Sequence, residues 1–335
     1  MNRAERRLRR RNRNRRIKKL MITAVVVVII MGLGIGWTDV KESTSLTDLV
    51  NRISAGAAGL FHTQTPGAGE SPGLKVYGAE DTESAAQNNT FAFSQPTTQV
   101  NINDLQDTRY LELINTDNPV TSWPEAGLLR QVWPAAPVGV SQDTLLNEAA
   151  LSAVIRLFDE ARDNNIGTLY VGSGYRDYEE QNRLYEEAWD KSYVQPPNHS
   201  EHHTGLAADI YALGVNTYEM ASSKEGRWLA DNAWRCGLIL RYAEGKSDIT
   251  QIAYEPWHFR YVGQPHARYM FQNNMCLEEY IRFLADSGGY RTEYDGKSYT
   301  ILYARPENGL ISIPEGLECT VSGDNTGGYV ITARE

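Results

Sequence analysis

Apolar residues recur at helical spacing in the middle of the chain. Intervals of three and four residues predict a helix whose buried face is formed by Leu146, Ala150, Val154, Leu157 and Ala161. The apolar run 168–172 after it predicts a buried strand. The polar stretch 177–189 predicts an exposed helix.

Helical and extended patterns continue to alternate up to about residue 285. The segment 226–236 is predicted to be helical, and the segments 206–212, 238–242 and 257–262 are predicted to be extended. Because no parallel crossover unit repeats, the pattern predicts an α+β domain over 103–285. After it, short β-like runs separated by Gly, Pro, Asn and Asp predict a small β appendage over 286–335.

A basic segment and an apolar run lie near the start of the chain. Residues 1–19 carry nine arginines and two lysines against the single acid Glu5, and residues 20–37 are almost entirely apolar. Such a run spans about 27 Å as a helix, close to the thickness of a bilayer core. The basic flank predicts a cytoplasmic N-terminus. The sequence therefore predicts a single-pass anchor in the cell membrane, with the remaining chain extracytoplasmic.

A cleaved secretory signal peptide is the alternative to this anchor. The apolar run is long for a signal core, and no small-residue cleavage site follows it directly. Residues 38–102 then predict a short amphipathic helix beside the bilayer and a flexible tether. From about residue 62 to 99 the chain is rich in Gly, Ser, Thr, Gln, Asn and Pro, which cannot bury enough apolar surface to order the segment.

The net charge of −9 is the sum of a basic N-terminal segment and a strongly acidic remainder of the chain. Taking away the eleven basic residues and one acid of the first 19 residues leaves 22 basic against 41 acidic residues, a net charge of −19. Such a charge keeps a domain soluble and repels nucleic acid, so we expect no nucleic-acid binding by the folded part. The cysteines Cys236, Cys276 and Cys319 are too few for a disulfide scaffold, although one pair could oxidise outside the cell.

Two segments, 200–209 and 255–258, combine histidines with carboxylates. Zinc that has no thiolate ligands is bound by histidine nitrogens and carboxylate oxygens, and three such ligands with one open position make a hydrolytic site. His202, Asp209 and His258 can supply these ligands. Spacing alone does not choose among His199, His202 and His203.

Three motifs decide between these histidines, because together they resemble the signatures of VanY-type zinc D-alanyl-D-alanine carboxypeptidases. They are Ser173-Gly174-Tyr175-Arg176, Ser200-x-His202-x-x-Gly205-x-Ala207-x-Asp209 and Glu255-x-Trp257-His258. The resemblance covers about residues 113–285 and leaves the tether and the β appendage outside it. It implies a hedgehog/D,D-peptidase-like fold.

The same resemblance assigns roles to individual residues. It makes His202, Asp209 and His258 the ligands of one zinc ion and Glu255 the catalytic base. Arg176 would stabilise the charge on the scissile carbonyl oxygen or bind the terminal carboxylate of the substrate.

Further residues of the motifs are assigned by the same resemblance. Gln181 and Ser200 are predicted to contact the substrate. His203 stands at a variable position of its motif, so the resemblance gives it at most a role beside the substrate.

The predicted activity is hydrolysis of the terminal D-Ala from peptidoglycan stem peptides. One alternative is L,D-carboxypeptidase activity on tetrapeptide stems, because the resembling family includes such enzymes. A second alternative is a zinc-stabilised module that binds the cell wall without turnover. The intact Glu255 argues against this second alternative.

Overall fold

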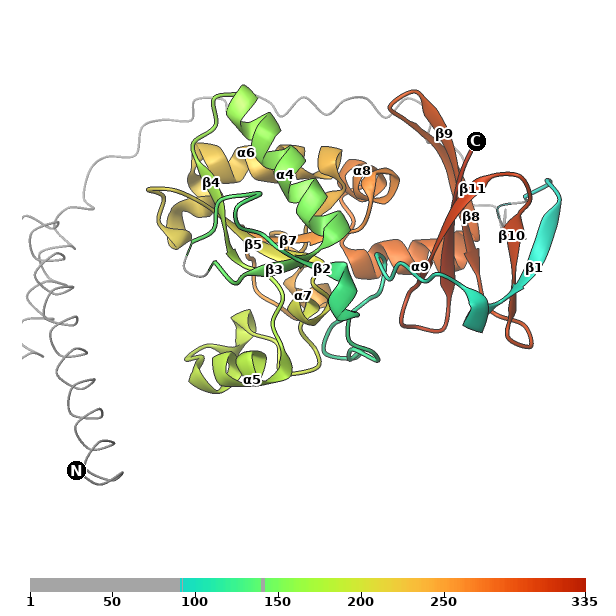
Figure 1. Cartoon of the computed structure of the whole chain (residues 1–335), viewed down its shortest axis with the longest axis horizontal. Coiled ribbons are helices and arrows are strands. Elements are labelled where there is room, and N and C mark those ends of the chain that lie inside the picture. Colours follow the sequence, from blue (N-terminus) through green and yellow to red (C-terminus); the bar gives the residue numbers. More distant parts are fainter. Residues whose placement is uncertain (1–90, 92, 140–141) are drawn as a thin grey trace, which may run out of the picture. The chain divides into compact units, whose positions relative to one another are not determined.

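The computed structural model describes residue 91, residues 93–139 and residues 142–335 (Figure 1). The predicted basic segment, the predicted anchor and most of the predicted tether lie outside these residues. Within the described part of the chain, no helix combines the length and the apolar character needed to cross a membrane.

A four-stranded antiparallel sheet forms the centre of the molecule, with strand order β4-β5-β7-β6. The strands are β4 (Leu169–Ser173), β5 (Ala207–Ala212), β6 (Leu238–Leu240) and β7 (His258–Tyr261). Alternate residues of β5 point to opposite faces of this sheet. Ala208, Ile210 and Ala212 belong to the main hydrophobic core, so Asp209 points to the other face.

Helices α4 (Glu148–Asp163) and α6 (Lys224–Asn232) contribute to the core on this face of the central sheet (Figure 1). Helix α4 begins after Asn147, whose side chain accepts a hydrogen bond from the Ala149 amide and so caps the first turn. Its apolar stripe is fully buried at Ala153, Val154 and Leu157. The stripe that the sequence predicted therefore forms the core of this part of the molecule.

A second core joins the central sheet to the C-terminal strands. Helices α8 (Gln264–Gln272) and α9 (Leu277–Ser287) pack in this core with residues of β6, β8, β9 and β12. The C-terminal strands are β8 (Gly289–Tyr294), β9 (Lys297–Ala304), β10 (Leu310–Pro314), β11 (Glu318–Gly323) and β12 (Tyr329–Arg334). Four of them form a sheet in the order β11-β12-β9-β8. The predicted β appendage is therefore a sheet packed on the rest of the molecule through α8 and α9.

The predicted start of the folded part at Asn103 was too late. Strand β1 (Thr97–Asn101) pairs antiparallel with β10 over five residues, from Thr97 opposite Pro314 to Asn101 opposite Leu310. The backbone groups along one edge of β1 are therefore hydrogen-bonded to a strand more than 200 residues away. Local composition, on which the tether prediction rested, carries no information about such a partner.

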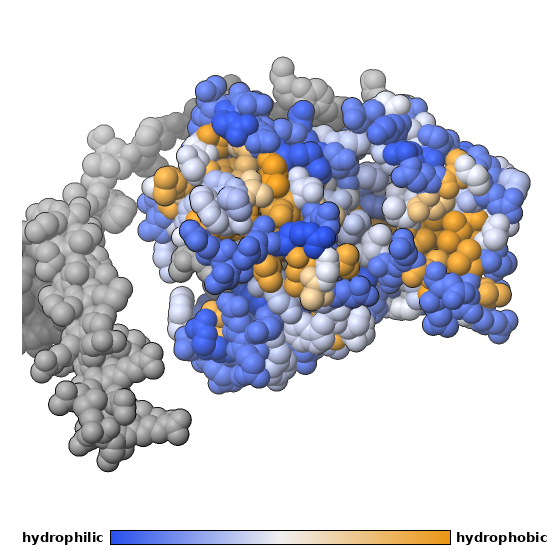
Figure 2. Space-filling model, in the orientation of Figure 1, coloured by the Kyte–Doolittle hydropathy of each residue, from blue (hydrophilic) through white to orange (hydrophobic). Residues whose placement is uncertain are grey.

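The remaining elements are short, except for the polar helix α5. They are η1 (Ile102–Asp104), η2 (Ala126–Leu128), β2 (Leu129–Gln131), β3 (Leu145–Asn147), α5 (Tyr178–Glu187), η3 (Lys191–Tyr193), η4 (Glu201–Thr204), η5 (Thr217–Ser222), η6 (Ala233–Cys236) and α7 (Ser247–Thr250). On the face shown in Figure 2, hydrophilic residues cover α5, whereas apolar residues gather over part of the C-terminal strands. The predicted helix 226–236 divides into α6 and the 3-10 turn η6.

The elements agree with an α+β fold class.

All three cysteines are free, and Cys236 and Cys276 are buried. The predicted possibility of an oxidised pair is therefore not realised in the part of the chain that the structure describes.

His266 of α8 links helix α9 to the C-terminal sheet. Its Nδ1 lies 2.6 Å from the Tyr280 hydroxyl and its Nε2 lies 2.8 Å from Thr332 Oγ1. Burial lowers the pKa of His266 from 6.5 to about 3. Between about pH 6.5 and pH 3, His266 therefore stays neutral in the folded protein but takes up a proton in the unfolded chain.

This difference predicts an acid-sensitive fold. The contribution of His266 to the free energy of unfolding is complete above pH 6.5 and decreases as the pH falls toward 3. At pH 5 the loss is about 2 kcal/mol. Urea unfolding at pH 7.5 and pH 5.0, with a chelator present, measures the loss. His266→Gln should reduce the pH dependence by a similar amount. An unchanged pH dependence in this variant would show that other groups carry it.

Candidate metal centre

Strand pairing places three polar residues in one row across the central sheet. Asp209 of β5 is opposite Ser173 of β4 on one side and opposite His258 of β7 on the other. Residues paired across neighbouring strands point to the same face, so their side chains are close together. This register brings two predicted ligands side by side, although 48 residues separate them along the chain.

His202 reaches the same site from a short turn before β5. Ser200 caps this turn, η4, and Gly205 ends it with φ 71°, in the left-handed region that favours glycine. A Cβ atom at Gly205 would also stand 2.7 Å from the Leu129 side chain. The His202 Nδ1 lies 2.6 Å from the Gly174 carbonyl oxygen, to which it donates its proton. Its Nε2 is therefore left free as an acceptor.

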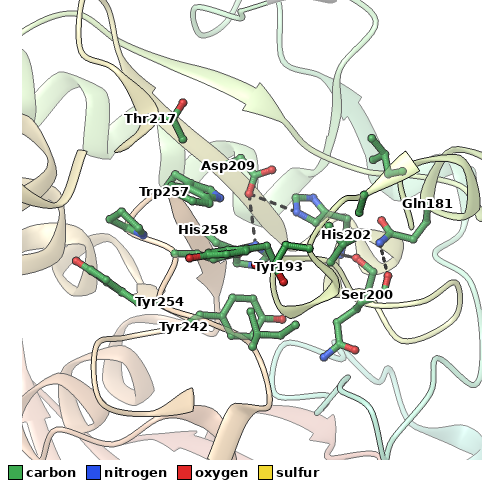
Figure 3. A pocket seen from close by; sticks show the side chains of 18 of the residues that line it. Gln181, Tyr193, Ser200, His202, Asp209, Thr217, Tyr242, Tyr254, Trp257 and His258 are labelled. Carbon is green, nitrogen blue, oxygen red and sulfur yellow. Dashed lines mark hydrogen bonds and ion pairs between the residues drawn. The ribbon is translucent and has the colours of Figure 1, made fainter. Parts of the chain in front are cut away.

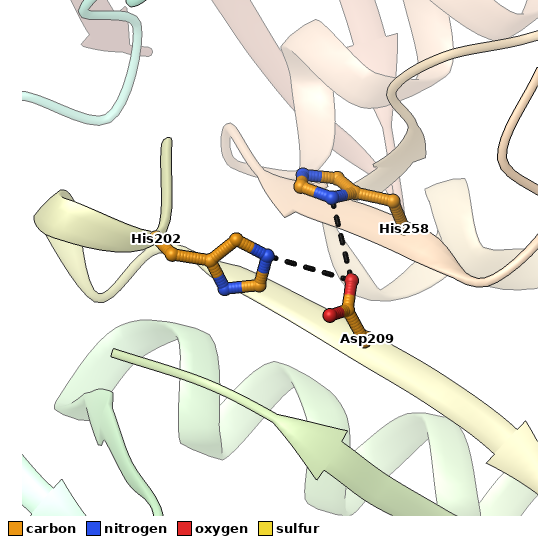
Figure 4. Close-up of side chains that lie close together, drawn as sticks. All are labelled: His202, Asp209 and His258. Carbon is orange, nitrogen blue, oxygen red and sulfur yellow. Dashed lines mark ion pairs between the residues drawn. The ribbon is translucent and has the colours of Figure 1, made fainter. Parts of the chain in front are cut away.

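Three candidate ligand atoms converge on one point (Figure 4). Asp209 Oδ1 lies 3.4 Å from His202 Nε2 and 3.4 Å from His258 Nδ1. Two ligands that bind a tetrahedral zinc ion at about 2.0–2.1 Å are about 3.3–3.4 Å apart. The two distances therefore equal the edge of a zinc tetrahedron.

The charges at the site also suit a cation. Burial alone would raise the pKa of Asp209, but His202, His258 and Arg176 outweigh burial and hold this pKa well below its ordinary value. Burial, helped by the positive charge of Arg176, lowers the pKa of His202 to about 4. Asp209 Oδ1 is buried without a hydrogen-bond partner. An ionised carboxylate oxygen without a partner, beside a neutral imidazole, is the donor set of a metal site.

Glu255 lies next to this point, in the turn before β7. Its Oε2 is 3.4 Å from His258 Nδ1, and its side chain is one of those lining the pocket described below. Burial raises the pKa of Glu255. Burial opposes protonation of His258, yet Asp209, Glu201 and Glu255 together raise the pKa of His258 well above its ordinary value. Three carboxylates around one imidazole therefore favour a positive charge at this position.

Arg176 lies directly after the motif strand β4 and contacts Asp209 itself. Its Nη2 donates to Asp209 Oδ2 at 2.8 Å, its Nε donates to Ser173 Oγ at 2.9 Å and its Nη1 donates to Gln181 Oε1 at 3.2 Å. Asp209 is thus held by Arg176 through one oxygen, while the other faces the two histidines. The sequence left two roles open for Arg176, and neither included this ion pair.

The metal ligands line a pocket of about 790 Å³ (Figure 3). Gln181 and Ser200 lie on one side of the ligands, and Trp257 and Tyr254 lie on the other. Gln181 is buried, and its amide donates to the Gln195 carbonyl at 2.6 Å. Ser200 is also buried, and its hydroxyl caps η4. Both residues line the pocket, as a substrate contact must, and their polar groups also hold the pocket wall together.

Trp257 forms part of the pocket wall. It is half-buried and stacks between Tyr193 and Tyr211, with ring centroids at 6.4 Å and 6.2 Å. Aromatic walls of this kind exclude water and contact the apolar parts of a ligand.

Sequence reasoning missed two residues that hold the site. His203 donates from Nδ1 to the Arg176 carbonyl at 2.8 Å and accepts at Nε2 from the Asn198 amide at 3.0 Å. It therefore fixes the backbone of Arg176, and both of its ring nitrogens are engaged. Glu201 is fully buried beside Arg241 and Arg260. Two arginines within apolar strand segments are the signal that a buried acid must be near.

Comparison with known proteins places this site in a family. The VanY family model, described as D-alanyl-D-alanine carboxypeptidase, matches residues 143–264. The bifunctional D-Ala-D-Ala dipeptidase and D-Ala-D-Ala carboxypeptidase VanXYC of Enterococcus gallinarum is 33% identical over 199 residues, which are 53% of this chain and 96% of that protein. The chain belongs to the VanY family.

Other VanY relatives match over less of their length. A D-alanyl-D-alanine carboxypeptidase of Enterococcus faecium is 38% identical over 177 residues, 52% of this chain and 57% of that protein. The chain spans about half the length of this relative and of two further curated relatives. The solved vancomycin resistance D,D-dipeptidase VanXYg, in complex with a D-Ala-D-Ala phosphinate analogue, aligns with a TM-score of 0.61 and 28% identity. That alignment covers 72% of this chain and all of VanXYg, so the fold is that of the D,D-peptidases.

Proposed function

We propose that this chain is a zinc-dependent D-alanyl-D-alanine carboxypeptidase that removes the terminal D-Ala from peptidoglycan stem peptides. The observation that carries the proposal is the convergence of His202, Asp209 and His258, with Glu255 beside them, in one open pocket. Membership of the VanY family supports the same reaction. The substrates named for its relatives contain D-Ala-D-Ala.

The donor set fits one zinc ion. It offers two imidazole nitrogens and one carboxylate oxygen, all buried, and its site opens to the pocket on one side. Zinc bound there would lower the pKa of a bound water to about 7 and polarise the scissile carbonyl.

Glu255 is the residue that we assign to proton transfer. Its carboxylate would take a proton from the attacking water and return it to the departing amine of the terminal residue. Its raised pKa favours proton uptake, because a base with a pKa closer to the working pH is a better acceptor.

Arg176 would act through both its charge and its shape. Its guanidinium holds Asp209 Oδ2 and keeps a positive charge beside the pocket, where the carbonyl oxygen or the terminal carboxylate of the substrate would lie. A lysine cannot contact Asp209, Ser173 and Gln181 at once, because it lacks the planar fork.

We therefore expect Arg176→Lys to lower kcat/KM by about 100-fold while zinc content stays unchanged. Steady-state kinetics with zinc analysis measure both quantities. Arg162→Lys, on the exposed end of α4, is the matched control and should leave both unchanged. Wild-type kinetics in Arg176→Lys would remove Arg176 from the proposed mechanism.

Defined stem peptides test the proposed reaction directly. We expect the protein with zinc to release D-Ala from pentapeptide stems, which mass spectrometry of the products detects. Cleavage of tetrapeptide stems alone would favour the L,D-carboxypeptidase alternative. Binding of wall fragments without any cleavage would favour the non-catalytic module.

We also propose that a single N-terminal helix anchors the protein in the cell membrane, with the peptidase part outside. The support is the apolar run 20–37 after the basic residues 1–19. Protease added to intact spheroplasts should then degrade the C-terminal part. Protection of the whole chain until lysis would contradict this topology.

A further inference from the structure

Glu201 is a fully buried acid one residue before the ligand His202. Its Oε1 accepts a hydrogen bond from Arg241 Nε at 2.7 Å and lies 2.9 Å from Arg260 Nη1. Its other oxygen, Oε2, has no hydrogen-bond partner and lies 3.6 Å from His258 Nε2. His258 Nε2 is likewise buried without a partner. Two buried polar atoms without partners therefore face each other across a gap slightly longer than a hydrogen bond.

The orientation of His258 determines where its proton lies. Its Nδ1 faces Asp209 Oδ1 at 3.4 Å, so this nitrogen is the one directed to the metal position. A neutral imidazole that offers Nδ1 to a cation carries its hydrogen on Nε2. That hydrogen points to Glu201 Oε2.

The two histidines of the site are thus oriented in complementary ways. His202 donates from Nδ1 to the Gly174 carbonyl, which leaves its Nε2 for the metal. His258 uses the opposite nitrogen, and Glu201 stands where Gly174 stands for His202. A metal-binding histidine is usually held through its second nitrogen by a carbonyl or a carboxylate.

We propose that Glu201 is a positioning residue that accepts the Nε2 proton of His258 and thereby fixes its tautomer and ring orientation for the metal. The proposal rests on the proposed zinc site. When zinc is bound, the distance from Oε2 to Nε2 would shorten to about 2.8 Å, the length of a charge-assisted hydrogen bond.

The surroundings keep the Glu201 carboxylate charged and in place. Arg241 also pairs with Glu278 of α9 at 2.7 Å, so two arginines and two acids balance each other inside the protein. Arg260 donates to the Tyr110 and Glu112 carbonyls at 3.2 and 3.0 Å. Because its partners are anchored in this way, Glu201 has no room to turn away from His258.

Zinc affinity of the full chain tests this role without reference to hydrolysis. We expect Glu201→Leu, measured by competition with a chromophoric chelator, to weaken zinc binding by about 10–100-fold. Glu201→Gln keeps an oxygen acceptor without the charge, so we expect a smaller loss of about 3–10-fold. The visible spectrum of bound Co²⁺ should also change in Glu201→Leu, because the His258 ring would be less constrained.

Glu278→Gln is the matched control, because it breaks the ion pair with Arg241 in the same buried network without facing His258. It should lower the stability to urea and leave zinc affinity and the Co²⁺ spectrum at wild-type values, because Arg241 Nε and Arg260 still hold Glu201 Oε1 in this variant. A zinc affinity lowered as much as in Glu201→Leu would overturn the proposal, because general loosening would then explain both. Wild-type affinity in Glu201→Leu would also overturn it.

Two further outcomes separate this inference from the proposed function. If Glu201→Leu does not fold, Glu201→Gln compared with Glu278→Gln decides, and equal zinc affinities would reject the positioning role. If the wild-type protein itself binds no zinc, the proposed function fails, and the inference fails with it. If zinc binds tightly to the wild-type protein and to both Glu201 variants, the positioning role is rejected and the proposed function is unaffected.

Discussion

Replacing Glu255 with alanine is expected to leave zinc bound and to lower kcat for D-Ala release by about 10²–10⁴-fold. The carboxylate lies beside the ligand cluster, 3.4 Å from His258 Nδ1, but it is not one of the three converging ligands. Its removal takes away the group that accepts the proton of the attacking water. The metal and its ligands remain.

Zinc content by atomic emission, together with D-Ala release from a pentapeptide stem, measures the two effects separately. Glu187→Ala, in an exposed acid on the same pocket, controls for the loss of a carboxylate as such, and should retain activity. Hydrolysis at the wild-type rate in Glu255→Ala would assign proton transfer to another residue.

Replacing His202 with alanine is expected to remove both zinc and activity. The remaining ligands, Asp209 and His258, supply two donor atoms, whereas a hydrolytic zinc site needs three from the protein. Because metal binding is coupled to folding, the variant should also lose the stabilisation that zinc gives. That stabilisation is about 4 kcal/mol when free zinc is 1,000 times the dissociation constant.

Thermal unfolding with and without zinc measures this loss. The wild-type midpoint should rise on addition of zinc, whereas the midpoint of His202→Ala should not respond. His199→Ala is the matched control, because the His199 ring donates to the Asn115 carbonyl and is not one of the three converging ligands, so this variant should keep its zinc. Equal zinc content in His202→Ala and Glu255→Ala would contradict the roles assigned to both residues.

The sequence identified candidate ligands but not the contacts that hold them in place. Motif spacing and resemblance selected His202, Asp209 and His258, which the structure brings together. The ion pair between Arg176 and Asp209 could not be foreseen, because it depends on the register of β4 against β5 and on the irregularity in β4 between Val171 and Ser173. Register depends on which faces of the two strands are buried and on the turns that connect them, which a short motif does not encode.

Fold prediction succeeded where the periodicity was long and local. The apolar stripe of α4 and the strands β4, β5 and β7 were expected within a few residues of their observed bounds. Helices α8 and α9 and strand β8 were not predicted, and β1 was assigned to the tether. For β1 the deciding interaction is with β10, at the far end of the sequence.

The pairing of β1 with β10 has a consequence for any soluble fragment of this protein. Cutting the chain at residue 103, just after β1, would leave the backbone of Leu310–Pro314 as an open edge, inviting strand exchange between molecules. The side chain of Ile311 in this strand, which is now 2% exposed, would become exposed to solvent at the same time. A fragment that retains residues 91–102 should therefore stay monodisperse, whereas one starting at residue 103 should self-associate.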